Sequence, residues 1–319
     1  MKKILFLILL IFMESFSFEV KQEKQIKVEG GVLDIVEYKD KIIVSTEKGT
    51  VEFINIKNGK VEKKITLPKF QDFMGDYQLP KVFSVDISPN GEILAVITEA
   101  TGGNRELYLE RKGNLQKVIS TQQRLQLTKV RFWNDNYILL STKGSELFLY
   151  DVKNNKVIYR KQVGNYSFGD MSICDDKNNL VIGDEGGTAI LVDIKSGNAY
   201  KKFDKVNVDQ IYRVDCKAGK ILTGGRDRRV ALYDIKSGSF KKVEADFIVF
   251  SVALSSDGRY GSYQLNESND IGIYDFQNDS LVAKLKGHKS TIGVMLFLSK
   301  DNLISGSDDG KIIVWRIKP

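Results

Sequence analysis

The stretch DIKSGNAYKK, residues 193–202, recurs almost unchanged as DIKSGSFKK at residues 234–242. In each copy an apolar run ends at an aspartate, Lys-Ser-Gly follows as a turn, and a lysine-rich segment comes next. The two aspartates lie 41 residues apart, and a fixed period of this size is typical of repeat architectures. The sequence therefore predicts a chain built from similar units.

The same pattern occurs seven times along the 319 residues. The polar residues that close the apolar runs are Asn55, Glu110, Asp151, Asp193, Asp234, Asp275 and Arg316. Only the first interval, 55 residues, departs from a spacing of 41 or 42. Each unit alternates short apolar segments with turns, and Asn90-Gly91 and Asp257-Gly258 favour two-residue type I′ hairpins. Four short strands per unit, with no helical periodicity, indicate the blades of a β-propeller.

The last unit, GHKSTIGVMLFLSKDNLISGSDDGKIIVW (residues 287–315), resembles a WD40 repeat. The resemblance implies a buried hydrogen-bonded set with a structural role, formed by His288, Ser305, Asp309 and Trp315. The fifth unit keeps Thr223 and Asp227 and has Tyr233 in the place of the tryptophan, but it lacks the Gly-His pair. By period and turn pattern the resemblance extends over the whole chain, and the expected fold is an all-β, seven-bladed WD40-type propeller.

The N-terminal 17 residues have the layout of a signal peptide. Lys2 and Lys3 precede an apolar run, Ile4–Met13, and Ser15 and Ser17 follow at the positions where a signal peptidase accepts small residues. We predict cleavage after Ser17, export to the periplasm, and a propeller domain over residues 18–319. The run is too short to span a bilayer, and no later run is long enough either.

The chain ends at what the repeat predicts to be the third strand of the seventh blade. The strand-like segment Phe18–Val28 precedes the first blade. We expect it to supply the missing outer strand and to close the ring, because closure would cover an otherwise exposed sheet edge.

Several classes of activity are disfavoured by composition. The single histidine, His288, excludes histidine-rich metal sites and Ser-His-Asp triads, and no Walker loop or dinucleotide fingerprint is present. The acidic clusters fall in predicted turns, where aspartate is favoured for local hydrogen bonding. The sequence therefore predicts a protein that is not an enzyme, with no metal and no cofactor.

The net charge of +7 comes from a lysine excess that gathers at the turn after each anchor. The lysines concerned are Lys57, Lys60, Lys153, Lys156, Lys195 and Lys236. No nucleic-acid partner is expected for an exported protein without interleaved base-stacking aromatics. Two interpretations stay open, a solvated basic face and a docking surface for an acidic protein or an anionic membrane.

The two cysteines, Cys174 and Cys216, fall at nearly equivalent positions on the first strands of adjacent predicted blades. These strands converge on the propeller axis, so the two side chains could be neighbours. A disulfide requires Cα atoms within about 7 Å, and adjacent blades usually lie farther apart. The sequence thus favours free thiols over a bridge.

The long first interval locates an insertion, Leu67–Pro80, between the first two blades, and a smaller excess lies at Thr98–Glu106. By analogy with WD40 propellers, both loops should emerge on one face as neighbours. The insertion carries the partner-binding candidates Phe70, Phe73, Met74, Tyr77 and Leu79. These side chains either fold back onto the propeller or serve as anchors for a partner.

A basic turn, GGRDRR, places Arg226, Arg228 and Arg229 on the same predicted face. These arginines could bind carboxylates or phosphates, or belong to a solvated turn around Asp227. They complete the set of partner-binding candidates.

Two functions follow as hypotheses. The first is a non-catalytic, monomeric, periplasmic propeller that acts as a scaffold or accessory factor for another protein. The chain is similar in length and layout to accessory propellers encoded with periplasmic nitrate reductase, which implies a respiratory enzyme as partner. The second is an enzyme or a small-ligand-binding propeller that uses its axial channel.

Overall fold

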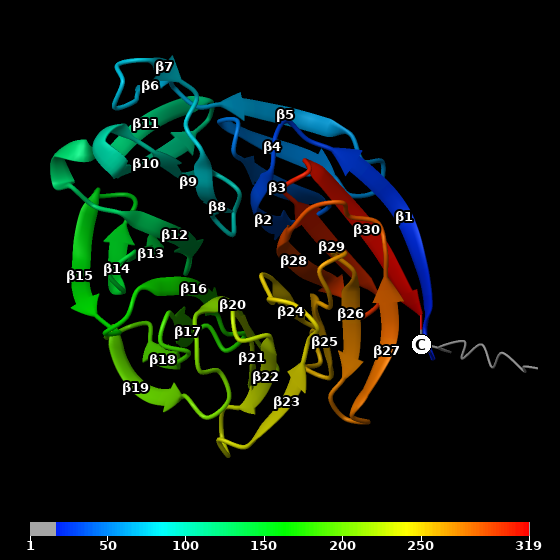
Figure 1. The fold of residues 1–319 in the computed structure, drawn as a ribbon. Helices are drawn as coiled ribbons and strands as arrows, with labels where there is room; N and C mark the ends of the chain where they lie inside the picture. Colours follow the sequence, from blue (N-terminus) through cyan, green and yellow to red (C-terminus); the bar gives the residue numbers. More distant parts are fainter. Residues whose placement is uncertain (1–16, 319) are drawn as a thin grey trace, which may run out of the picture.

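The structure, a computed structural model, describes residues 17–318, so the predicted signal peptide lies outside the described residues except for Ser17. Seven four-stranded antiparallel sheets stand around a central axis, and a small two-stranded hairpin projects from the ring (Figure 1). The predicted all-β, seven-bladed propeller is confirmed.

The first three blades are formed by consecutive strands, innermost first. Blade 1 comprises β2 (Val32–Tyr38), β3 (Lys41–Thr46), β4 (Thr50–Asn55) and β5 (Val61–Thr66). Blade 2 comprises β8 (Val82–Ile87), β9 (Ile93–Glu99), β10 (Arg105–Arg111) and β11 (Asn114–Ile119). Blade 3 comprises β12 (Leu127–Phe132), β13 (Tyr137–Thr142), β14 (Glu146–Asp151) and β15 (Lys156–Gln162).

The next three blades repeat this order. Blade 4 comprises β16 (Phe168–Ile173), β17 (Asn179–Asp184), β18 (Ala189–Asp193) and β19 (Asn198–Phe203). Blade 5 comprises β20 (Ile211–Lys217), β21 (Lys220–Gly225), β22 (Arg229–Asp234) and β23 (Phe240–Glu244). Blade 6 comprises β24 (Val252–Leu254), β25 (Tyr260–Gln264), β26 (Ile271–Asp275) and β27 (Ser280–Leu285).

Blade 7 joins the two ends of the described chain. Its inner strands are β28 (Ile292–Ser299), β29 (Asn302–Ser307) and β30 (Lys311–Lys318), and β1 (Glu19–Lys27) pairs antiparallel with β30 as the outer strand. The ring of Phe18 also packs edge-on against Tyr260, with 5.3 Å between ring centroids. The predicted closure by the N-terminal segment is confirmed.

The repeated phrase has a structural role. In each of blades 1 to 6 the anchor residue lies at or within one residue of the end of the third strand. The carboxylate of Asp234 accepts hydrogen bonds from the Ser237 backbone N–H (2.7 Å) and hydroxyl (2.8 Å), which lowers the pKa of that carboxyl. Asp151, Asp193 and Asp275 bond their own turns in the same way. The repeated phrase therefore encodes a turn that is closed by hydrogen bonds to the carboxylate of the anchor residue.

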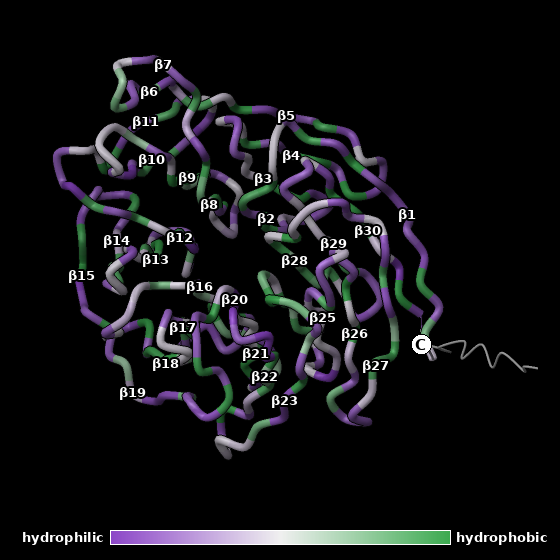
Figure 2. Tube along the Cα trace, viewed as in Figure 1, coloured by the Kyte–Doolittle hydropathy of each residue, from purple (hydrophilic) through white to green (hydrophobic). Residues whose placement is uncertain are grey.

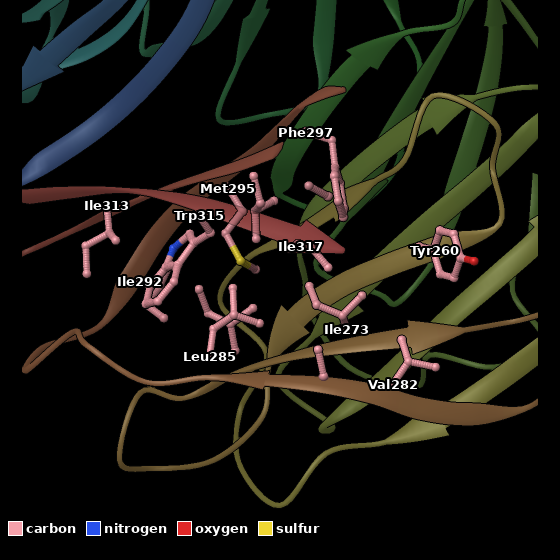
Figure 3. Close-up of a cluster of buried hydrophobic side chains, with 14 residues drawn as sticks. Tyr260, Ile273, Val282, Leu285, Ile292, Met295, Phe297, Ile313, Trp315 and Ile317 are labelled. Carbon is pink, nitrogen blue, oxygen red and sulfur yellow. The ribbon is translucent and has the colours of Figure 1, made fainter. Parts of the chain in front are cut away.

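The hydrophobic core is divided among the interfaces between blades. Seven clusters of buried apolar side chains each take members from two adjacent blades. Figure 3 shows the cluster between blades 6 and 7, where Trp315, Met295 and Ile292 face Leu285 and Ile273. In Figure 2 the apolar segments lie mainly along the second and third strands, while outer strands such as β15, β19 and β23 mix hydrophilic with hydrophobic residues. A single blade cannot bury both of its faces, so the ring as a whole carries the core.

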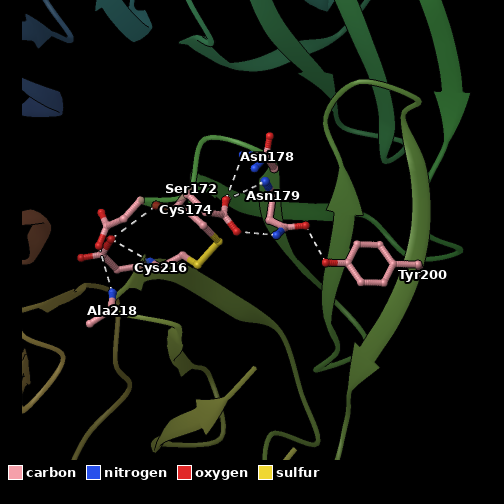
Figure 4. Close-up of a disulfide and its surroundings, with 10 residues drawn as sticks. Ser172, Cys174, Asn178, Asn179, Tyr200, Cys216 and Ala218 are labelled. Carbon is pink, nitrogen blue, oxygen red and sulfur yellow. Dashed lines mark hydrogen bonds between the residues drawn. A yellow bond between two sulfur atoms is a disulfide. The ribbon is translucent and has the colours of Figure 1, made fainter. Parts of the chain in front are cut away.

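The prediction of free thiols is wrong. Cys174 and Cys216 form a disulfide between blades 4 and 5, with 4.8 Å between their Cα atoms (Figure 4). The blades approach closely here because Gly169 lies against β20, where a side chain would overlap the carbonyl oxygen of Ile211. Since the bridge is buried, it is protected from solvent.

The type I′ prediction for two turns is also wrong. Gly91 and Gly258 have positive φ (81° and 68°), but the preceding Asn90 and Asp257 do not. The connections between β8 and β9 and between β24 and β25 are longer than two residues. Their Gly therefore supplies a single left-handed position at the end of a longer turn.

Candidate functional site

The insertion between blades 1 and 2 folds into a small hairpin that stands away from the ring (Figure 1). Its strands are β6 (Phe70–Gln71) and β7 (Tyr77–Gln78). At the tip, the Asp72 carboxylate accepts hydrogen bonds from the Met74 and Asp76 N–H groups at 2.9 and 3.0 Å. A side-chain acceptor that closes a turn in this way reduces its conformational freedom. The hairpin tip is thus ordered by its own sequence.

The second loop braces the base of the hairpin. The 3₁₀ helix η1 (Thr101–Gly103) lies between β9 and β10, and the Thr101 hydroxyl donates to the Gln71 carbonyl at 2.6 Å. The prediction that the two loops are neighbours is confirmed. A second 3₁₀ helix, η2 (Thr121–Gln123), starts with a capping box at Ser120 before blade 3.

The apolar side chains of this hairpin point mainly into solvent. Phe73, Met74 and Tyr77 are 91%, 75% and 68% exposed, and Leu79 is 37% exposed. Phe70 is half-buried, and Leu79 lies against Gly49 of blade 1. Folding back onto the propeller therefore applies in part to Phe70 and Leu79, whereas the other three side chains point into solvent. The hairpin tip is therefore a small exposed apolar surface that is flanked in the sequence by two aspartates.

The other candidate set lies in blade 5, far around the ring from the hairpin (Figure 1). Arg226 and Arg228 are in the turn between β21 and β22, and Arg229 is the first residue of β22. Arg229 donates to the Val206 carbonyl at 2.7 Å and is half-buried, so it braces its own blade. Arg226 lies 3.8 Å from the Asp209 carboxylate, and Arg228 is exposed. The structure therefore does not bring the two candidate sets together into one site.

Three members of the WD40-type set in blade 7, His288, Ser305 and Trp315, are joined by hydrogen bonds as the resemblance implied. The fourth, Asp309, accepts hydrogen bonds from the Lys289 and Lys311 N–H groups and from none of the other three. The Ser305 hydroxyl lies 2.7 Å from His288 Nε2 and accepts from Trp315 Nε1 at 2.8 Å. His288 Nδ1 lies 4.0 Å from the Asp309 carboxylate. Burial lowers the pKa of His288 to about 4. A neutral, enclosed imidazole of this kind holds two strands together and is not open to substrate.

Blade 5 contains an equivalent set, of which the sequence pattern identified Thr223, Asp227 and Tyr233 but missed the fourth member, Asn207. The Asn207 side chain accepts from the Thr223 hydroxyl at 2.6 Å and donates to the Asp227 carboxylate at 3.2 Å. The Tyr233 hydroxyl accepts from the Val206 N–H at 3.1 Å. An asparagine thus takes the histidine's place. The sequence spacing could have identified Asn207, because it precedes Thr223 by 16 residues and His288 precedes Ser305 by 17.

A buried network of charges crosses the axial channel, and the sequence analysis missed it. Arg131 holds both carboxylate oxygens of Asp34 at 2.9 Å, and Lys129 bridges Asp34 (3.1 Å) and Asp170 (3.2 Å). Arg213 lies 3.4 Å from Asp170 and donates to the Gly293 carbonyl. Asp34, Lys129, Asp170 and Arg213 all lie at the third position of an innermost predicted strand. That recurrence was the signal that could have found them.

Electrostatics in the channel follow from burial. Burial opposes ionisation of Asp34, but Arg131 and Lys129 outweigh it and hold the pKa of that carboxyl well below its ordinary value. Burial and the neighbouring Arg131 lower the pKa of Lys129. The network lines a cavity of about 330 Å³, and the buried Ser251 hydroxyl on its wall has no hydrogen-bond partner among residues 17–318. The channel has room and polarity for a small ligand.

Some basic side chains of the outer strands bind the next blade. From blade 2 to blade 5, one donor on the third or the outer strand of each blade reaches the backbone carbonyl that follows the anchor of the next blade. The donor–acceptor pairs are Arg111 to Val152, Tyr159 to Ile194, Lys201 to Ile235 and Lys241 to Phe276. Part of the lysine richness is therefore structural.

Within residues 17–318 there is no group of three or more His, Cys, Asp or Glu side chains placed to hold a metal ion. In the same range, no helix has the length and hydrophobicity needed to cross a membrane.

Comparison with known proteins gives a family match for one repeat. Residues 279–316 match the family described as "WD domain, G-beta repeat", a match that runs from the outer strand of blade 6 through β28 and β29 into β30 of blade 7. The chain is 26% identical over 192 residues to the echinoderm microtubule-associated protein-like elp-1 of Caenorhabditis elegans, a match covering 56% of this chain and 21% of that protein. It is 21% identical over 243 residues to the WD repeat-containing protein 55 homolog of Dictyostelium discoideum, covering 74% of this chain and 58% of that one. The chain thus spans only part of each relative, and both are eukaryotic.

Proposed function

We propose that this propeller is a non-catalytic interaction scaffold that binds another protein through the β6–β7 hairpin. The observation that best supports this proposal is that Phe73 is 91% exposed on a tip that Asp72 holds in one conformation. Apolar anchors that enter a partner's pocket dominate many interfaces, and an anchor already ordered loses less conformational entropy on binding. Propellers with WD40 repeats typically mediate protein interactions, which supports the same role.

We also propose that the protein works in the periplasm. The N-terminal leader pattern supports export. The Cys174–Cys216 disulfide supports it independently, because such bridges persist in oxidising compartments and are rare in the cytosol. The more specific role, an accessory factor for a periplasmic respiratory enzyme such as nitrate reductase, is the narrower form of this hypothesis. The two eukaryotic relatives lend it no support.

The second candidate function is binding of a small ligand in the axial channel. The unpartnered Ser251 hydroxyl beside the 330 Å³ cavity favours it. The balanced ion pairs of the channel weigh against it, because Arg131 and Lys129 are already engaged by Asp34 and Asp170. A ligand would have to compete with those contacts.

Two variants separate these functions in a strain that lacks the gene. The Phe73→Ser/Met74→Ser double variant should leave the melting temperature unchanged, because both side chains are exposed. It should fail to restore the deletion phenotype. Ser251→Leu, which fills part of the channel cavity, should restore it if its melting temperature is also unchanged. The opposite pattern would move the function from the hairpin to the channel.

A further inference from the structure

We propose that the outer strands of blades 3, 4 and 5 form a second docking surface, which binds an extended acidic segment of a partner protein. This surface, here called the basic belt, consists of β15, β19 and β23. Together these strands carry seven basic residues and one acidic residue. It is distinct from the hairpin and does not depend on the function assigned to it.

Three lysines of the belt are available for a partner. Lys156, Lys161 and Lys202 are exposed and form no ion pair within residues 17–318. The other basic residues of the belt are engaged: Lys201 and Lys241 donate to carbonyls of the next blade, Arg160 pairs with Glu146, and Lys242 with Glu244. The free cations therefore remain on two adjacent blades.

Exposed apolar side chains accompany these charges. Val157, Ile158, Tyr200 and Phe240 are all exposed, at 40% to 56%, and all four belong to the belt. A solvated basic strand needs no such side chains, and lysines alone suffice to keep a sheet edge from pairing. Apolar contact area beside unpaired positive charge fits a partner that supplies both carboxylates and aromatic or aliphatic groups.

Charge of this kind does not surround the whole ring. The outer strand β1 contains Glu19 and Glu23 among its lysines, and in β5 the exposed Lys64 pairs with Glu29. The net charge is +3 on β15 and +2 on β19 but only +1 on β23, as on β1 and β5. The basic excess is therefore concentrated on blades 3 and 4, and blade 5 adds the exposed Phe240 to the belt.

The shape of the belt favours a protein segment over a membrane. In Figure 1, β15, β19 and β23 follow one another along the convex outer arc of the ring. Three consecutive blades turn through about three sevenths of a circle, so a flat bilayer cannot touch all three outer edges at once. A flexible acidic chain can follow the arc and contact each blade.

The test measures binding of a fluorescein-labelled dodecapeptide of alternating glutamate and tyrosine to the oxidised mature chain, by fluorescence anisotropy at about 50 mM and about 300 mM NaCl. The belt variant is Lys156→Glu/Lys161→Glu/Lys202→Glu. The control variant, Lys21→Glu/Lys57→Glu/Lys60→Glu, changes the net charge equally at exposed positions outside the belt. Both variants are first checked for an unchanged melting temperature.

We expect the wild-type chain to bind the peptide, more weakly at the higher salt, and the belt variant to lose at least about tenfold in affinity. The control variant should stay within about twofold, and Tyr200→Ser should weaken binding at unchanged charge. The hairpin variant Phe73→Ser/Met74→Ser should bind as wild type does, so that failure of one surface is distinguishable from failure of the other.

Three results would overturn the inference. The first is no binding by the wild-type chain, and the second is an equal loss in the belt and control variants, which would reduce the effect to net charge. The third is that the wild-type chain cosediments with phosphatidylglycerol-containing vesicles and the belt variant does not, although the belt variant still binds the peptide as wild type does. That result would assign the belt to a membrane.

Discussion

Replacing both cysteines with alanine tests the bond that joins blades 4 and 5. The bridge connects residues 42 positions apart, and closing a loop of that length lowers the entropy of the unfolded chain by about 13 cal/mol/K. The corresponding stabilisation is about 4 kcal/mol at 25 °C. For a domain of roughly 300 residues, this loss lowers the melting temperature by about 6 °C. Alanine leaves no buried polar group at these sites, so the comparison reports mainly on the cross-link.

The assay is scanning calorimetry of the mature wild-type chain and the Cys174→Ala/Cys216→Ala variant, each with and without reductant. The wild-type chain should lose stability on reduction, and the variant should not respond. A thiol count on unreduced, denatured wild-type protein should find no free thiol within residues 17–318. Two free thiols, or a variant that melts within about 1 °C of the oxidised wild type, would refute the reasoning.

Three further changes test other parts of the fold. Lys201→Met should lower the free energy of unfolding by about 1–2 kcal/mol in urea titrations, because the Lys201 ammonium donates a hydrogen bond to the next blade. The control, Lys202→Met, should change the free energy of unfolding by less than about 0.5 kcal/mol. Equal effects of the two substitutions would contradict the structural role of Lys201. His288 is neutral in the folded protein because its pKa is about 4. The stability that the neutral side chain contributes is fully present above pH 6.5, the ordinary pKa of histidine, and falls as the pH drops toward 4. The whole loss is about 3 kcal/mol. His288→Asn should remove that part of the pH dependence, and melting curves that keep the same pH dependence would refute it. Asp34→Ala should cost about 3–5 kcal/mol by leaving its two cationic partners uncompensated, and a near wild-type midpoint in guanidinium would be inconsistent with the network.

The blade count and the closing strand could be predicted because both follow from local patterns. Each blade repeats an apolar run, a capped turn and a polar outer strand, as at Asp193 and Asp234, so one period fixes the architecture. The seventh unit lacks an outer strand, and the strand-like segment Phe18–Val28 belongs to no other unit, so the sequence alone allowed the two to be paired. The insertion was located by the same period, because it broke the spacing.

The remaining features depend on how the blades meet. The Cys174–Cys216 bridge requires a closer approach than a generic propeller has, and Gly169 permits it. The channel network joins Asp34 to Lys129 across 95 residues of sequence. The repeat marks the position of each charge, but which charges pair depends on how the blades pack around the axis. The exposure of the hairpin aromatics likewise depends on where the insertion stands relative to the ring, so it could not be read from residue types.

The central claim is that Phe73 at the hairpin tip contacts a partner protein, and photocross-linking at that position tests it most directly. A photoreactive phenylalanine analogue is placed at position 73, and in a matched chain at Tyr166, another exposed aromatic outside the hairpin. Irradiation of the source cells should yield one saturable cross-linked species for position 73 and none for position 166. That partner, once purified, should bind the wild-type chain at least about tenfold more tightly than Phe73→Ser/Met74→Ser. No cross-link at position 73, the same species at both positions, or an unchanged affinity would contradict the claim.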